Sequence, residues 1–219
     1  MSLYIRKRRS EMTIIRRVAH FPALGKEPDY RKLLDLRVAR VSSRGVTPIF
    51  MSRLLPDGGP ELVVYIRFDD MDALEKFRAV DRADPDFINA VQEINTLSRR
   101  GFTVALFAPI LQADSGRRSN ARYFHRWTAR ASSGNANELR AVLEEFVKAR
   151  QADGRPVGLT RQVLSPTGPT FIFTETYETL SEYESEYVTK SPPSLATAQQ
   201  KIKGLLQSPV EQVMYEILS

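Results

Sequence analysis

Two stretches of this sequence carry the same order of predicted elements. Each one reads strand, helix, strand, tight turn, strand, proline-broken helix and strand. Equivalent landmarks lie about 105 to 110 positions apart, as with Gly45 and Gly154 (154 − 45 = 109). Such a repeat constrains the fold strongly, because each copy has to form the same unit. We expect a basic arm at residues 1–12, one unit at 13–111, a linker at 112–120 and a second unit at 121–219.

The first helix of each copy is predicted from apolar residues at spacings of three and four, which place them on one helix face. Pro28 suits a first turn, and Asn135 or Asn137 is the candidate N-cap of the later helix. The apolar residues are Tyr30, Leu33, Leu34, Val38 and Val41 in the first copy, and Leu139, Val142, Leu143, Phe146 and Val147 in the second.

The second helical region of each copy is interrupted by proline. Asp70 and Thr179 are the candidate N-caps, and Pro85 and the pair Pro192 and Pro193 come about 15 residues after them. Because proline breaks a helix interior but suits a first turn, we expect two shorter helices in each copy.

Composition excludes several kinds of site. The chain has no cysteine, so disulfides, thiolate zinc, iron–sulfur clusters and cysteine nucleophiles are excluded, and a cytoplasmic location is expected. No apolar run approaches the ~18 residues of a membrane span, so we expect no membrane partner.

The net charge of +6 suggests nucleic acid as a partner, but the charge is concentrated at one end of the chain. Residues 1–17 hold six basic side chains against Glu11, which gives 6 − 1 = +5. A short basic arm is typical of a solvated terminal tail, so nucleic acid is not the expected partner. A nucleic-acid-associated protein that uses this arm stays an alternative.

The repeated βαββαβ order with a broken second helix resembles the dimeric α+β barrel superfamily, which includes antibiotic-biosynthesis monooxygenase-like and NIPSNAP-like proteins. The resemblance implies two four-stranded antiparallel sheets that face each other as a barrel, with helices outside and a small-molecule cavity between. We therefore expect an α+β fold of two tandem ferredoxin-like units, packed face to face as an α+β barrel. The protein would be a monomer with an internal barrel or a homodimer.

Fold alone does not give the function, since this architecture hosts oxygenases, isomerases, haem proteins and proteins without a known reaction. The chain has no glycine-rich phosphate loop, no His-Glu-x-x-His and no Gly-x-Ser-x-Gly motif. We expect a small-molecule-binding protein, a cofactor-independent monooxygenase or isomerase for an aromatic or polyketide-like compound, without cofactor or metal. The alternative is a non-catalytic structural or interaction protein with a packed barrel.

His20 and His125 are the only histidines, and both fall on the first predicted strand of a copy. Strand alternation puts Tyr123, His125 and Trp127 on one face. If these side chains reach the barrel interior, His125 is the catalytic candidate, and Tyr123, Trp127, His20 and Tyr65 are ligand-binding candidates.

The alternatives for these residues are structural. A histidine at a strand end can hydrogen-bond locally, and an aromatic row on a sheet can be core packing. Arg67 and Glu175 are further cavity candidates from the third strand of each copy, and solvent exposure would explain them equally well.

Overall fold

The computed structural model describes residues 12–54, 56, 58–113, 120–189 and 193–218. The chain divides into two compact units: one is Met1–Ala108 with Leu218–Ser219, and the other is Pro109–Ile217. Leu218 belongs with the first unit because its N–H donates to the carbonyl oxygen of Phe50 at 2.8 Å. Most of the basic arm and of the linker lies outside the described residues.

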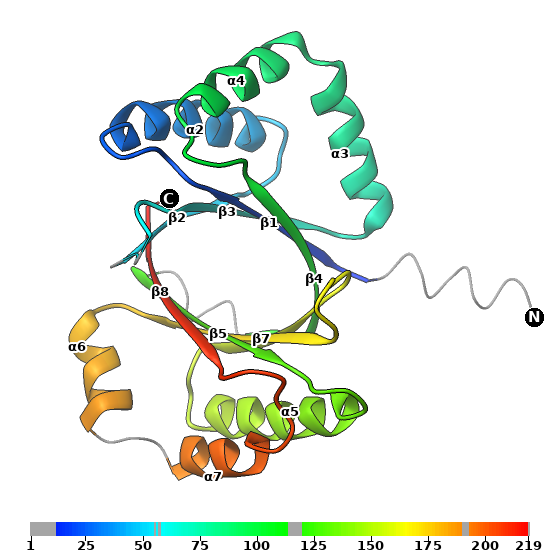
Figure 1. Ribbon diagram of the computed structural model, residues 1–219, viewed down its shortest axis with the longest axis vertical. Coiled ribbons are helices and arrows are strands. Elements are labelled where there is room, and N and C mark those ends of the chain that lie inside the picture. Colours follow the sequence, from blue (N-terminus) through cyan, green and yellow to red (C-terminus); the bar gives the residue numbers. More distant parts are fainter. Residues whose placement is uncertain (1–11, 55, 57, 114–119, 190–192, 219) are drawn as a thin grey trace, which may run out of the picture. The chain divides into compact units, whose positions relative to one another are not determined.

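The first unit is a four-stranded antiparallel sheet covered on one face by three helices (Figure 1). The sheet order is β4-β1-β3-β2. The elements in chain order are β1 (Ile14–His20), α2 (Glu27–Ser42), β2 (Ile49–Arg53), β3 (Leu62–Phe68), α3 (Met71–Ala83), α4 (Pro85–Thr96) and β4 (Thr103–Leu111).

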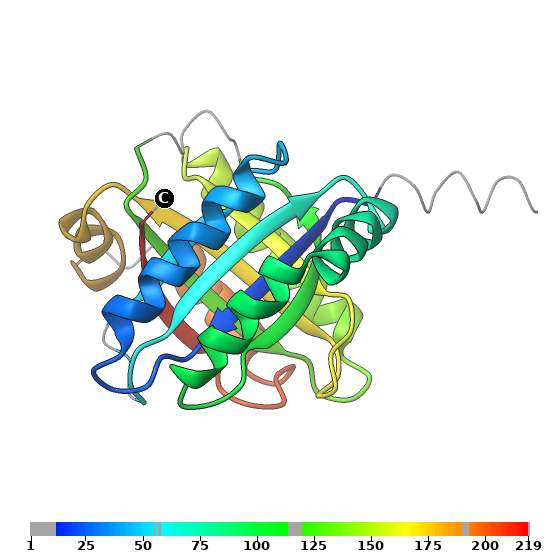
Figure 2. The same ribbon diagram turned by 90° about the horizontal axis from the view of Figure 1, so that it is seen from above.

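The helices of the first unit begin where the sequence predicts. Proline occupies the first turn of α2, and the Asp70 carboxylate accepts the N–H of Ala73 at 2.8 Å as the N-cap of α3. Asp84 separates α3 from α4 in an extended conformation, and its side chain caps α4 just before Pro85. The broken helix is therefore two capped helices. Figure 2 looks onto this helical layer, with β3 in cyan visible beneath it.

The second unit repeats this order with the sheet β8-β5-β7-β6. Its elements in chain order are β5 (Tyr123–Arg130), α5 (Ala136–Ala152), β6 (Val157–Gln162), β7 (Thr170–Tyr177), α6 (Leu180–Tyr183), η2 (Glu184–Thr189, a π-helix), α7 (Pro193–Ile202) and β8 (Glu211–Ile217).

The caps of the second unit differ from expectation at one place. Thr179 caps α6 by accepting the N–H of Glu182 at 3.1 Å, as predicted. Asn135 occupies the N-cap position of α5, but its side chain makes no capping bond and instead donates to Ser132 Oγ at 2.8 Å. The amide is therefore held by a bond from its NH2 group to a nearby hydroxyl, and its oxygen does not accept a helix N–H.

The core of the second unit lies between its sheet and α5. Leu139, Leu143, Phe146 and Val147 of α5 pack with Trp127 and Phe173 of the sheet. Burial of such a side chain stabilises the fold by about 1.5–3 kcal/mol, so this contact fixes which face of the sheet the helices cover.

The predicted fold class is confirmed in both units: an α+β chain of two tandem ferredoxin-like units with antiparallel sheets. The face-to-face packing of the two sheets as a barrel stays a prediction, which protection of edge-strand amides from hydrogen exchange would bear out. No helix in the described ranges is both long and apolar enough to cross a membrane.

Candidate functional site

Both histidines lie on the helix-covered face of their sheets. His125 contacts Tyr183 and Tyr187 of the α6 and η2 segment, and His20 contacts Tyr30 of α2. The expectation that these side chains point away from the helices is therefore not met, because strand alternation separates two faces but does not say which of them the helices cover.

His125 is enclosed by aromatic rings. Its ring centroid lies 3.6 Å from that of Trp127, 4.9 Å from that of Tyr183 and 5.9 Å from that of Tyr187, and both tyrosine rings are nearly perpendicular to it. Trp127 stacks in turn on Phe173 at 3.9 Å. We call the group of His125, Trp127, Tyr183 and Tyr187 the aromatic enclosure.

The imidazole of His125 is neutral and lacks one hydrogen bond. The residue is 2% exposed, and burial lowers the pKa of His125 to about 3. Among the described residues its Nδ1 atom has no hydrogen-bond partner. Because buried polar atoms are almost always paired, such an atom calls for an explanation.

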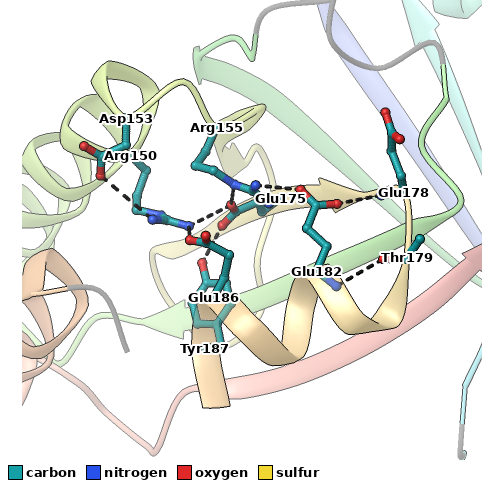
Figure 3. A network of polar contacts seen from close by, with 9 residues as sticks. All are labelled: Arg150, Asp153, Arg155, Glu175, Glu178, Thr179, Glu182, Glu186 and Tyr187. Atoms are coloured by element: carbon teal, nitrogen blue, oxygen red, sulfur yellow. Dashed lines mark hydrogen bonds and ion pairs between the residues drawn. The ribbon is translucent and has the colours of Figure 1, made fainter. Parts of the chain in front are cut away.

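A buried carboxylate lies beside the enclosure (Figure 3). Glu175 of β7 is opposite His125 in the strand register and is fully buried. Its Oε1 atom accepts from Arg150 at 3.0 Å and from Arg155 at 2.7 Å, and its Oε2 atom accepts from the hydroxyl of Tyr187. The Glu175 carboxylate thus accepts three hydrogen bonds, two of them from positively charged arginines, and holds these neighbours in place. His125 is left as the proton acceptor of this region.

The same arginines tie the α6 and η2 segment to the sheet. Arg155 donates to Glu182 at 2.6 Å, and Arg150 donates to Glu186 at 3.2 Å. Burial raises the pKa of Tyr187, and the negative charge of Glu175 raises it further. Tyr187 therefore stays a neutral hydrogen-bond donor to Glu175.

No protein-family model and no curated protein matches the sequence. Solved structures do match. A proposed monooxygenase from Fusobacterium nucleatum subsp. nucleatum gives a TM-score of 0.75 at 11% sequence identity, covering 95% of this chain and 93% of its own. A proposed monooxygenase from Lactobacillus acidophilus gives 0.64 at 14% identity, with 95% and 94% covered. An anthrone oxidase-like protein gives 0.64 at 10% identity, with 95% and 92% covered.

This chain has the tandem ferredoxin-like fold of these monooxygenase-like proteins. At such low identity the likeness shows the fold alone, so function has to be argued from the residues of this chain.

The five predicted site residues do not form one group. His125 and Trp127 are in contact, and Tyr123 lies two residues earlier on the same face of β5, half-buried. In the first unit His20 faces the helices, where its Nδ1 pairs with the Tyr30 hydroxyl at 3.0 Å. Tyr65 lies on the other face of that sheet, because its neighbours Val64 and Ile66 face α2.

Sequence reasoning missed the residues that close the enclosure. Tyr183 and Tyr187 are four apart in a segment predicted to be helical, which puts both rings on one face. That spacing was the available signal. Arg150 and Arg155 gave none, since they reach Glu175 from the end of α5 and from the loop after it.

No group of three or more metal-ligating side chains occurs among the residues that the structure describes.

An apolar cavity of about 50 Å³ lies on the α7 side of Trp127, bordered by Phe146, Phe173 and Ile202. The second unit therefore offers a neutral base, stacked aromatic rings and a small apolar space close together.

Proposed function

We propose that the protein binds a small aromatic or polyketide-like molecule in the second unit and acts on it as a cofactor-independent monooxygenase. The observation that carries this proposal is the buried, neutral imidazole of His125 with an unpaired Nδ1 among aromatic rings. A hydroxyl or activated C–H group of a ligand would supply the missing partner, and His125 would accept its proton.

The surroundings of His125 suit an aromatic ligand. Trp127 offers a ring for stacking, and Tyr123 stands at the start of the same strand. The cavity beyond Trp127 is apolar, and apolar cavities stay free of water and admit small apolar molecules such as O₂. His20 and Tyr65 belong to the first unit and are not part of the proposed site.

Ligand entry requires a movement of the segment formed by α6 and η2, which covers His125 and is called the covering segment below. Both tyrosines are half-buried, but Tyr187 is fixed by its bond to Glu175, whereas Tyr183 contacts His125 through a T-shaped ring contact. Tyr183 is therefore the ring that a ligand would displace. π-helical turns such as η2, which follows Tyr183 directly, are frequent at functional sites.

The fold likeness supports this choice of reaction. Two of the matched structures are described as proposed monooxygenases and one as anthrone oxidase-like. Anthrone is a polycyclic aromatic ketone with an acidic CH₂ group, so it is a suitable probe for an aromatic site that contains a base.

A packed interaction protein is the second candidate. It is favoured by the observation that His125 does not line the cavity beyond Trp127. In that case the aromatic enclosure would be core packing and His125 would serve stability.

Ligand binding distinguishes the two candidates. Trp127 is the only tryptophan in the chain, so its fluorescence reports on the enclosure alone. We expect anthrone to quench this fluorescence with saturation, and His125→Asn to weaken the binding about tenfold or more, because a hydrogen bond to the ligand is lost. The matched control His20→Asn should leave the binding unchanged.

The packed alternative predicts a different pattern. No saturable quenching in the unaltered protein, or binding that His125→Asn leaves intact while thermal stability falls, would contradict the proposed ligand site.

A further inference from the structure

Two cavities meet in the first unit between its sheet and its helices. A narrow one of about 40 Å³ is bordered by Arg16 and His20 of β1, Arg37 of α2 and Phe77 of α3. A wider one of about 330 Å³ lies between α3 and β4, bordered by Leu74, Arg78, Phe102, Val104 and Leu106. Arg16, Asp81 and Phe87 border both cavities, so Arg16 stands at their junction.

Arg16 and Arg37 form no direct ion pair among the described residues, although the negative charge of Asp81 attracts both. Within the described part of the chain, neither guanidinium makes a hydrogen bond or an ion pair, and Arg37 lies 4.8 Å above the ring of Phe87. Burial lowers the pKa of Arg16, and the positive charge of Arg37 lowers it further. The two guanidinium groups therefore repel each other in a poorly solvated place.

The nearby carboxylates are engaged elsewhere. Asp81 accepts from Arg44 at 2.6 Å, and Asp84 accepts from Arg44 at 3.3 Å and pairs with Arg40. Arg78 and Arg82 add further positive charge at the wider cavity. The site consequently has an excess of positive charge that the protein itself does not neutralise.

We propose that this junction binds the carboxylate of a small aromatic acid. Guanidinium groups recognise carboxylates with two parallel hydrogen bonds, and two of them here have free donors. The apolar body of the ligand would occupy the wider cavity, against Phe87, Phe102 and Leu106. Its volume of about 330 Å³ falls within the usual range of small-molecule sites.

This site is independent of the aromatic enclosure, since all of its residues belong to the first unit. His20 borders it as a neutral group, because burial and then the charges of Arg37 and Arg16 lower the pKa of His20 to about 3. The hydroxyl of Tyr30 pairs with His20, which leaves the two arginines as the anion-binding groups.

Calorimetric titration with 2-naphthoate tests the proposal, with the neutral 2-naphthalenemethanol as the paired probe. We expect 2-naphthoate to bind at least about tenfold more tightly than the alcohol, and Arg16→Leu or Arg37→Leu to remove this preference. The control Arg31→Leu removes an exposed charge from α2, the helix that carries Arg37, and should keep the preference for 2-naphthoate.

Two further readouts separate binding from folding. Without ligand, Arg37→Leu should not lower the melting temperature, because it removes one of two repelling charges. In the unaltered protein, added salt should weaken 2-naphthoate binding but not that of the alcohol. Equal binding of the two probes, or unchanged binding in both arginine variants, would overturn the proposal.

Discussion

At the scale of single residues, the two histidines are alike in burial and different in pairing. His20 and His125 are each 2% exposed, and burial lowers the pKa of both to about 3. His20 has the hydroxyl of Tyr30 as a partner, whereas Nδ1 of His125 has none among the described residues. The unpaired atom marks His125 as the one that could meet a ligand.

These lowered pKa values make stability depend on pH. In the unfolded chain a histidine takes up a proton near pH 6.5, but in the folded protein it stays neutral down to about pH 3. The unfolded state therefore binds more protons below pH 6.5, and the free energy of unfolding falls as the pH is lowered.

We expect a loss of about 2 kcal/mol per histidine between pH 7.5 and pH 5, measured by urea denaturation. The double variant His20→Asn and His125→Asn should remove most of this slope. A slope as steep in the double variant as in the original chain would show that other groups cause it.

At the scale of elements, Glu175 connects three parts of the second unit. Through Arg150, Arg155 and Tyr187 it joins β7 to α5, to the loop before β6 and to η2. The covering segment is thus held against the sheet by one buried carboxylate (Figure 3).

Removing the charge of Glu175 should loosen these connections. We expect Glu175→Gln to lower the free energy of unfolding by about 3–5 kcal/mol, because Arg150 and Arg155 lose the one carboxylate partner that is fully buried and keep only the more exposed Glu186 and Glu182. The control Glu178→Gln changes an exposed side chain three residues away and should cost less than about 0.5 kcal/mol. Equal losses in the two variants, measured by urea denaturation, would show that the network adds little.

The elements themselves could be predicted from the sequence, because their signals are local. Pro85 ends one helix and starts the next, and Asp70 and Thr179 cap the helices that follow them, as expected. The side-chain bond of Asn135 to Ser132 was not predictable, since the NH2 group and the oxygen of one amide favour different partners and different orientations.

The candidate site was harder to predict than the elements. Strand alternation grouped His125 with Trp127 correctly, but it left open which face of β5 the helices cover. That choice depends on the packing of α5 against Trp127 and Phe173, which brings together residues far apart in the sequence. The proximity of Arg16 and Arg37 was not predicted for the same reason, because they lie on two separate elements, β1 and α2, that meet only at one cavity.

At the scale of the whole molecule, the two units share one fold but differ in the chemistry they hold. The first has, at a cavity junction, two arginines that form no ion pair with any described residue, and the second has a neutral histidine among aromatic rings. Duplication of a ferredoxin-like unit has therefore produced two sites with different ligand preferences on our account.

The rate of oxygen uptake with anthrone, after subtraction of the spontaneous reaction, tests whether His125 acts as a general base on an aromatic substrate. We expect the protein to accelerate uptake and His125→Asn to slow the enzymatic rate about 10²- to 10⁴-fold, the usual contribution of a general base. His20→Asn should keep the rate of the original chain. Uptake no faster than the spontaneous reaction, or a rate that His125→Asn leaves unchanged, would contradict the account.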